Sequence, residues 1–150
     1  MSTIVIKRLT KELNNINKEP IEGFTLVDSS NIMIWKGILD GPKDTPYENG
    51  KFKIQITFTA EYPINPPNVK FLQYIFHPNF YKDGQICVDI LQNHEWSPSQ
   101  NVSTIIYSLR SLFMDPNPTS PANREAAELY IKDNIAYVAK VKENIKNYIL

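Results

Sequence analysis

The segment HPNFYKDGQICVDIL, residues 77–91, contains Cys87, the only cysteine of this 150-residue chain. Pro78 and the Asp83-Gly84 pair predict an irregular loop with a turn shortly before the cysteine, rather than a core strand. Loops held by a rigid scaffold are common places for reactive side chains. A lone cysteine is also often a small buried hydrophobic residue. The segment alone therefore leaves two interpretations open, a nucleophile or a core thiol.

The N-terminal segment predicts an amphipathic helix that ends near Pro20. Apolar residues recur there at helical spacing: Ile6, Leu9, Leu13 and Ile16. Charged residues fall mostly off that stripe: Lys7, Arg8, Lys11 and Glu12. We therefore expect the apolar stripe to face the core and the charged residues to face solvent.

The middle of the chain predicts an antiparallel sheet. Residues 52–58 alternate between apolar and polar side chains, as in a strand with one buried face, and Asn49-Gly50 just before them is typical of a tight turn. Residues 32–39 are the expected partner strand, residues 69–72 a short third strand and residues 24–27 an edge strand. Short connections between successive strands favour antiparallel pairing. Residues 62–67, YPINPP, predict a stiff surface loop.

The pattern returns to helix after Cys87. Residues 102–113 have apolar side chains on one side, and the DPNP run at residues 115–118 ends that helix. A last helical region covers residues 122–150, with a break near Asp133-Asn134 and an apolar face: Val138, Val141, Ile145, Tyr148 and Ile149. We therefore expect one α+β domain over residues 1–150.

Composition narrows the class of protein. Sixteen basic residues balance sixteen acidic ones, whereas direct nucleic-acid binding favours a basic excess. No apolar run approaches the roughly 18 residues of a membrane span, and the N-terminus lacks the features of a signal peptide. A single cysteine forms no internal disulfide and no cysteine-rich zinc site. We expect an intracellular protein, in the cytoplasm, the nucleus or both, without a metal.

A nucleophilic Cys87 is compatible with two chemistries. A thiol, with a reference pKa of about 8.5, supplies enough thiolate to attack a carbonyl. A cysteine peptidase would pair it with a histidine base, for which His77 and His94 are candidates. An acyl carrier instead needs a donor for the oxyanion and help for an attacking amine, whose reference pKa is about 10.4. Asn79 offers an amide donor, and Asp89 and Ser120 are candidate acceptors.

The motifs along the chain resemble those of the ubiquitin-conjugating enzymes. The match consists of an ordered series over nearly the whole chain: Gly41-Pro42 with Asp44-Thr45-Pro46-Tyr47, Tyr62-Pro63 with Pro66-Pro67, His77-Pro78-Asn79, Gly84 to Leu91 with Cys87, Trp96-Ser97-Pro98 and Asp115-Pro116-Asn117-Pro118. Residues 115–123, DPNPTSPAN, are most similar to the post-replication-repair branch, whose members ubiquitinate histone and DNA-clamp lysines.

This resemblance implies a fold with an N-terminal helix, a four-stranded antiparallel sheet and C-terminal helices. It implies that Cys87 accepts ubiquitin as a thioester from an activating enzyme, which consumes the ATP, and passes it to substrate lysines with a RING-type ligase. No cofactor, direct nucleic-acid contact or membrane is expected. A catalytically silent scaffold with the same fold is the alternative from another class, but such scaffolds lack the cysteine that this chain retains.

Roles near the thiol are implied by position in the motifs. Asn79 is interpreted as either the oxyanion donor or a loop organiser. His77 and Pro78 match structural positions of the active-site loop. Asp89 matches an acidic position that aligns the lysine, with a plain turn-stabilising carboxylate as the alternative.

Ser120 falls where many relatives have aspartate, which leaves two hypotheses. Either the substrate supplies the acidity, or phosphorylation of Ser120 before Pro121 restores negative charge.

Partner surfaces are implied in the same way. Lys7, Arg8 and Lys11 resemble the helix surface that meets the activating enzyme and ligases, although a solvated helix face would look alike. Ile64 and Ser97-Pro98 match the two loops that grip RING-type ligases; loop rigidity alone is the alternative for their prolines. Between Asn93 and Trp96 the chain has His94-Glu95, one residue more than the branch usually shows, and it ends at Leu150 without an acidic tail.

Overall fold

The structure is a computed structural model and describes residues 3–92 and 94–149. Helix α1 (Thr3–Lys18) precedes four strands: β1 (Phe24–Asn31), β2 (Ile34–Asp40), β3 (Lys51–Thr57) and β4 (Asn68–Phe71). A long connection with the 3-10 turn η1 (Asp89–Leu91) leads to α2 (Val102–Met114), and α3 (Arg124–Lys132), α4 (Asn134–Ile145) and the 3-10 turn η2 (Lys146–Tyr148) follow. The predicted α+β fold is confirmed.

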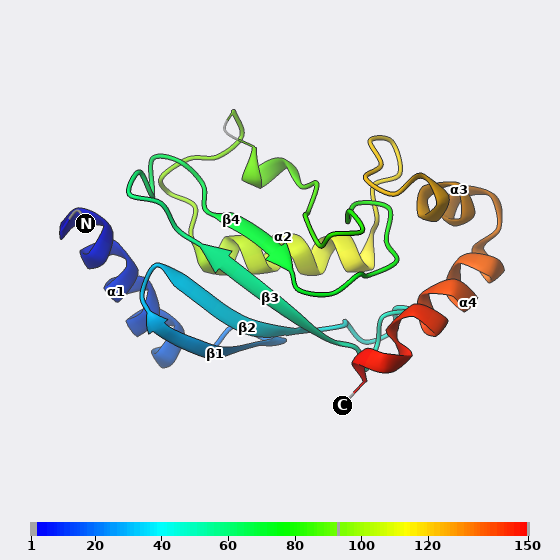
Figure 1. The fold of residues 1–150 in the computed structure, drawn as a ribbon, viewed down its shortest axis with the longest axis horizontal. Coiled ribbons are helices and arrows are strands. Elements are labelled where there is room, and N and C mark those ends of the chain that lie inside the picture. The colour runs from blue at the N-terminus through cyan, green and yellow to red at the C-terminus, as the bar shows by residue number, and fades with distance from the viewer. Residues whose placement is uncertain (1–2, 93, 150) are drawn as a thin grey trace.

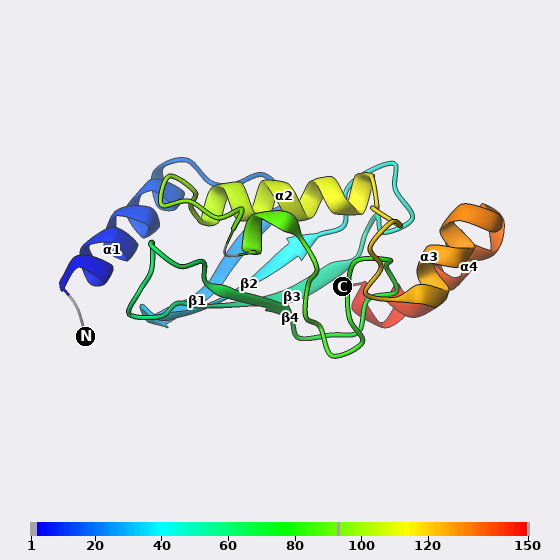
Figure 2. The same cartoon turned by 90° about the horizontal axis from the view of Figure 1, so that it is seen from above.

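The strands pair antiparallel in chain order, β1-β2-β3-β4. The alternation predicted for residues 52–58 is present, since Phe52, Ile54 and Ile56 are buried on one face of the sheet. Helix α2 lies across that face, with α1 at one end of the molecule and α3 and α4 at the other (Figures 1 and 2). The connection from β4 to α2 runs beyond the β4 edge (Figure 1). The loop that contains Cys87 is therefore backed by the sheet and α2.

An aromatic cluster joins this loop to the scaffold. Phe113 of α2 stacks on Phe52 of β3 at a centroid distance of 5.2 Å, and Phe71 of β4 lies 4.9 Å from Phe80. Phe80 in turn stacks on His77 at 4.0 Å. Burial of these four phenylalanine rings contributes on the order of several kcal/mol and fixes the start of the loop.

The prediction for α1 is partly wrong. The buried residues are Val5, Leu9, Glu12 and Ile16. Ile6, which was expected inside, is 36% exposed, and Glu12, which was expected in solvent, is 6% exposed. The buried face follows the 3.6-residue period with a carboxylate in it, and such burial requires that the carboxylate be paired and hydrogen-bonded.

The C-terminal helices break where predicted. Asp133 ends α3, and its side chain accepts a hydrogen bond from the Ala136 N–H as the N-cap of α4. The predicted apolar face is partly wrong, because Ile149 is 48% exposed, whereas Tyr137 is buried with its hydroxyl against that of Tyr47. Among the described residues, every helix is too short or too polar to cross a bilayer.

Candidate active site

The thiol of Cys87 is half-buried and opens into a cavity of about 450 Å³. Asp89 from the segment after the cysteine, Ser108 and Leu112 from α2, and Asn117 from the loop after α2 also line this cavity. The Sγ atom lies 3.9 Å from the backbone oxygen of Ser120. The cysteine is therefore accessible to a ligand rather than sealed in the core, which favours the nucleophile interpretation over a core thiol.

The Asp83-Gly84 turn positions the cysteine, as its sequence predicted. Gly84 has φ +93°, and a Cβ there would lie 1.9 Å from the backbone oxygen of Phe71, so this position requires glycine. The Gly84 N–H donates to the Tyr81 oxygen at 3.0 Å, and the Gly84 oxygen accepts from the Phe71 N–H at 2.8 Å. Beyond the turn, the Cys87 N–H donates to the Asn79 oxygen at 2.8 Å. The cysteine backbone is thus held by the loop that precedes it.

Asn79 is buried, and both polar atoms of its side chain are used within the protein. Its Nδ2 donates to the backbone oxygen of Asn117 at 2.7 Å, and its Oδ1 accepts from the Asn117 N–H at 2.9 Å. This arrangement favours the loop-organiser interpretation over that of a free oxyanion donor. Sequence reasoning missed Asn117 as the partner, since the DPNP run was interpreted as the end of a helix and as a family motif, and neither interpretation indicates a contact with Asn79.

His77 is fully buried, and both of its ring nitrogens form hydrogen bonds to the backbone. Its Nδ1 accepts the Asn79 N–H at 2.9 Å, so the ring proton lies on Nε2 and is donated to the Leu112 oxygen at 2.8 Å. Burial lowers the pKa of His77 to about 3, although the bond to Leu112 opposes that change. Its burial and its two hydrogen bonds favour a structural role for a neutral His77 over that of a base for Cys87.

Pro78 ties the active-site loop to the segment before α3. Its backbone oxygen accepts from the N–H groups of Ala122 at 2.8 Å and Asn123 at 3.1 Å. The side-chain amide of Asn123 also donates to the Tyr74 hydroxyl at 3.2 Å. These contacts fix the segment that contains Ser120 next to the cysteine.

Two exposed side chains lie beside the thiol, those of Asp89 and Ser120. Asp89 is the first residue of η1, and within the described chain its carboxylate takes part in no hydrogen bond or ion pair. Ser120 contributes its backbone oxygen to the Sγ contact, while its hydroxyl has no intramolecular partner in the same part of the chain. Both side chains line the Cys87 cavity and are accessible to an incoming amine.

The basic residues of α1 that were expected to bind partners differ in whether their charge is free or used within the protein. Lys7 and Lys11 are exposed, whereas the Arg8 guanidinium is used internally. It donates to the backbone oxygens of Pro98 at 2.9 Å and Gln100 at 2.6 Å and pairs with Glu12 at 2.9 Å. Arg8 therefore holds the 98–100 loop against α1.

Glu12 is a buried structural residue whose role sequence reasoning missed. Besides the Arg8 contact, its carboxylate accepts the Val102 N–H at the start of α2, at 2.8 Å, and the hydroxyl of Tyr62. Desolvation next to Glu12 raises the pKa of Tyr62 well above its ordinary value, so this hydroxyl remains a donor. One buried carboxylate thus joins α1, the proline loop and α2.

The two predicted ligase loops are adjacent. Trp96 Nε1 donates to the Pro63 oxygen at 2.7 Å, which holds the proline loop beside the loop that follows η1. Ile64 at the tip of the proline loop is 75% exposed, and Pro98 is exposed nearby in the second loop. The hydroxyl groups of Ser97 and Ser99 form a hydrogen bond at 2.7 Å, in which either one can be the donor.

The predicted insertion lies in an exposed turn just before Trp96. His94 and Glu95 are both exposed, and the Glu95 N–H donates to the Gln92 oxygen at 2.9 Å. Asn93, the residue that precedes the insertion, lies outside the described residues.

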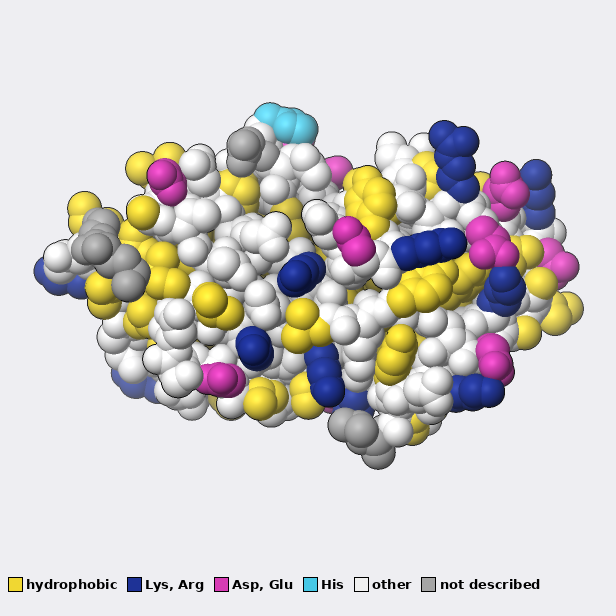
Figure 3. Space-filling view, viewed as in Figure 1, with side chains coloured by type: hydrophobic (Ala, Val, Ile, Leu, Met, Phe, Trp, Pro, Cys, Tyr) yellow, Lys and Arg dark blue, Asp and Glu magenta, His cyan; other side chains and the backbone are white. Residues whose placement is uncertain are grey.

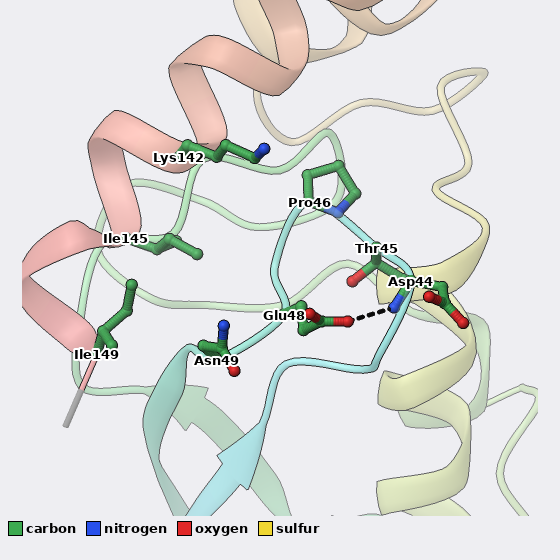
Figure 4. A pocket seen from close by; sticks show the side chains of 8 residues that line it. All are labelled: Asp44, Thr45, Pro46, Glu48, Asn49, Lys142, Ile145 and Ile149. Carbon is green, nitrogen blue, oxygen red and sulfur yellow. Dashed lines mark hydrogen bonds between the residues drawn. The ribbon is translucent and has the colours of Figure 1, made fainter.

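Another cavity, of about 500 Å³, lies between the β2–β3 loop and α4 (Figure 4). Asp44 and Glu48 line it from the loop, where the Asp44 N–H donates to the Glu48 carboxylate at 2.7 Å. Lys142 and Ile145 line it from α4, and Ile149 from the segment after η2. It shares no lining residue with the Cys87 cavity. Within residues 3–92 and 94–149, no group of three histidine, cysteine or acidic residues is placed to hold a metal ion.

Comparison with known proteins identifies the family to which this site belongs. A family model described as ubiquitin-conjugating enzyme matches residues 8–145. The chain is 46% identical over 147 residues to ubiquitin-conjugating enzyme E2 2 of Mycosarcoma maydis, an alignment that covers 97% of this chain and 79% of that protein. Proteins of the same name are 46% identical in Kluyveromyces lactis, with 97% and 89% covered, and 45% identical in Saccharomyces cerevisiae, with 97% and 85% covered.

Proposed function

This chain belongs to the ubiquitin-conjugating enzyme family and is a transferase of ubiquitin, and we propose that Cys87 is the residue that holds ubiquitin as a thioester. Members of this family act with an activating enzyme before them and a ligase after them. The observation that carries the assignment is the accessible thiol of Cys87, the only cysteine of the chain, in a cavity beside a free carboxylate.

The proposed reaction has two acyl transfers. The Cys87 thiolate attacks the thioester carbonyl that joins ubiquitin to the activating enzyme, a new C–S bond forms and the activating enzyme's thiolate leaves. The neutral amine of a substrate lysine then attacks the new thioester, the bond to Cys87 breaks, and an isopeptide bond forms. The amine loses one proton and the Cys87 thiolate regains one. The Cys87 cavity accommodates the C-terminal tail of ubiquitin.

The residues around the thiol have complementary roles in this proposal. Asp89 supplies a carboxylate that aligns the lysine and accepts its proton, which an amine with a pKa of about 10.4 otherwise retains at neutral pH. Asn79 acts through the loop, by fixing the Asn117 segment next to the cavity. His77 and Pro78 hold the loop in place through hydrogen bonds, and the His77 ring stays neutral. Ser120 borders the path of the amine, where phosphorylation would add negative charge.

Partner binding is assigned to the end of the molecule that contains α1. Lys7 and Lys11 meet the activating enzyme and the ligase through their exposed charges, and Ile64 with Ser97 and Pro98 contacts a RING-type ligase. Arg8 supports this surface by holding the 98–100 loop in place. Exposed apolar side chains on stiff loops lose little entropy on docking, which supports this assignment.

We also propose a domain extent, a cellular location and a branch of the family for this chain. Residues 1–150 form one core domain, which the family match to residues 8–145 supports. The protein acts inside the cell, in the cytoplasm, the nucleus or both, where an activating enzyme and ATP are present. Residues 115–123, DPNPTSPAN, support membership of the post-replication-repair branch, with histone or DNA-clamp lysines as substrates.

The test of this function is incubation with activating enzyme, ATP and ubiquitin. We expect an adduct that reductant removes, that is absent in Cys87→Ala, and that resists reductant in Cys87→Ser because an oxygen ester replaces the thioester. The exposed His94→Gln variant is the matched control and forms the adduct normally. Absence of any adduct in the unaltered protein, or its persistence in Cys87→Ala, would contradict the proposal.

A further inference from the structure

The carboxylate of Glu12 lies beneath the surface that we assign to the ligase, and it accepts hydrogen bonds from three elements. Its Oε2 accepts from the Arg8 Nε at 2.9 Å and from the Tyr62 hydroxyl. Its Oε1 accepts from the Val102 N–H at 2.8 Å. Because Glu12 is buried, it acts on a partner protein only through the residues that it holds.

One of these residues, Arg8, connects Glu12 to the 98–100 loop. A guanidinium group is planar, so fixing its Nε also fixes the directions of its other two nitrogens. Those nitrogens donate to the backbone oxygens of Pro98 at 2.9 Å and Gln100 at 2.6 Å. The position of this loop therefore depends on the orientation that Glu12 gives to Arg8.

The Tyr62 hydroxyl connects the same carboxylate to the proline loop, residues 62–67. Tyr62 is buried, and Ile64 at the exposed tip follows it by two residues. A continuous chain of hydrogen bonds thus runs from Tyr62 through Glu12 and Arg8 to the 98–100 loop. It joins the two predicted ligase loops by way of α1.

The two loops are also joined directly, by the bond from Trp96 Nε1 to the Pro63 oxygen at 2.7 Å. Segments joined at one point pivot about it, whereas two separate connections fix their relative position. Figure 3 shows apolar side chains gathered at the end of the molecule that contains α1 and the proline loop. Loops held in the bound arrangement before docking lose less entropy when a partner binds this surface.

We propose that Glu12 is a positioning residue for ligase binding, which sets the relative position of Ile64 and Pro98 without touching the ligase. This inference rests on the proposed function, because it requires that these two loops bind a RING-type ligase. Neither Glu12 nor the side chains that it holds line the Cys87 cavity. Loss of the chain should therefore weaken ligase binding and leave the transfer step intact.

Two conservative variants break the chain at different links. Tyr62→Phe removes the hydroxyl that joins the proline loop to Glu12 and leaves the Arg8 ion pair in place. Glu12→Gln retains the shape of the side chain and an oxygen that accepts the Val102 N–H, but its NH2 group then faces the Arg8 Nε. Two donors that face each other form no bond, so this variant releases Arg8.

The test is discharge of the preformed Cys87–ubiquitin thioester onto free lysine, with titration of a purified RING domain that stimulates the unaltered enzyme. In each variant we expect the RING concentration for half-maximal stimulation to rise about three- to tenfold, as loss of loop preorganisation predicts. The rate without RING and the rate at saturating RING should remain unchanged. The double variant should show no more than the larger single effect, because both substitutions break one chain.

Val141→Ala is the matched control for loss of stability. Val141 is buried in α4, at the opposite end of the molecule from α1, and its truncation destabilises the protein without touching the ligase loops (Figure 1). Its half-maximal RING concentration should equal that of the unaltered enzyme.

An unchanged half-maximal concentration in either Tyr62→Phe or Glu12→Gln would overturn the inference. An equal rise in Val141→Ala, or effects that multiply in the double variant, would also overturn it. Failure of the proposed function is a different result, in which no reductant-sensitive adduct forms on Cys87 of the unaltered enzyme.

Discussion

Asn79 and Asn117 are joined by two hydrogen bonds, one in each direction, between the side-chain amide of the first and the backbone of the second. The pair links the loop before the cysteine to the loop after α2, 38 residues further along the chain. Because Cys87 donates its N–H to the Asn79 backbone oxygen, the same residue also supports the nucleophile. Asn79 thus connects three segments around the thiol.

Replacement of Asn79 by alanine should destabilise the protein as well as slow transfer. The N–H and oxygen of Asn117 would both lose a partner, which costs about 2 kcal/mol in the free energy of unfolding. The measurement is urea unfolding beside the rate of discharge onto free lysine. A variant with unchanged stability and a rate lower by about 10²–10³ would contradict the loop-organiser role and support an oxyanion donor.

Replacement of Glu12 by alanine should be among the most destabilising changes on α1. Arg8, Tyr62 and the Val102 N–H would all lose their acceptor, at an expected cost of about 3 kcal/mol. Tyr62→Phe removes only one of these bonds and should cost about 1 kcal/mol. Thermal and urea unfolding measure both. Equal, small effects of the two variants would contradict a central structural role for the carboxylate.

Replacement of Ile64 by alanine should separate ligase binding from stability. The side chain is 75% exposed, so unfolding free energy should change by less than about 0.5 kcal/mol. Ligase-stimulated discharge should fall by about tenfold or more if this residue anchors the interface, while loading of Cys87 remains normal. The matched control is Val27→Ala on β1, where an apolar side chain 62% exposed lies away from the loops. Equal stimulation of all three proteins would argue against the assigned surface.

Replacement of Ser120 by aspartate should increase the rate of discharge onto free lysine several-fold. Its backbone oxygen lies at the sulfur, so a carboxylate on this residue would be placed to hold the ammonium and accept its proton. Thr119→Asp adds the same charge one exposed residue earlier and is the control. A Ser120→Asp rate no higher than that of the unaltered enzyme would count against activation by phosphorylation at this position.

The features that the sequence predicted correctly are those set by residues close together in the chain. The alternation of residues 52–58, the Asp83-Gly84 turn and the break at Asp133 depend on neighbouring residues, and all are confirmed. Burial of Glu12 depends on the Tyr62 hydroxyl and the Val102 N–H, which are 50 and 90 residues away in the chain. The local pattern of apolar and charged residues contains no sign of these donors, so it wrongly predicted an exposed glutamate.

The same distinction applies to the site. The Cys87 loop was recognisable because its motif is contiguous, whereas the Asn79–Asn117 pair combines residues 38 positions apart. Each asparagine lies in a motif of the sequence, but neither motif indicates that the two residues pair with each other. The role of the pair follows only from the packing of the loop after α2 against the loop before the cysteine.

Burial of His77 should make stability depend on pH above the range in which carboxylates titrate. The unfolded chain binds a proton on this ring below about pH 6.5, whereas the native ring stays neutral until about pH 3. Since the unfolded state then binds more protons, stability is complete above pH 6.5 and is lost as the pH falls toward 3. Between pH 7.5 and 5 the expected loss from this residue is about 2 kcal/mol.

Urea unfolding at several pH values between 7.5 and 5 measures this loss. His77→Gln should be less stable at pH 7.5, because the bonds to Asn79 and Leu112 are altered, but its stability should change far less over the same pH range. His94→Gln is the matched control, since that ring is exposed and its removal should leave the slope intact. In the unaltered protein, His77 ring resonances should not titrate above pH 5. A His77 ring that titrates near pH 6.5 in the native protein would contradict the buried, neutral assignment, and with it the hydrogen bonds that hold the loop before Cys87.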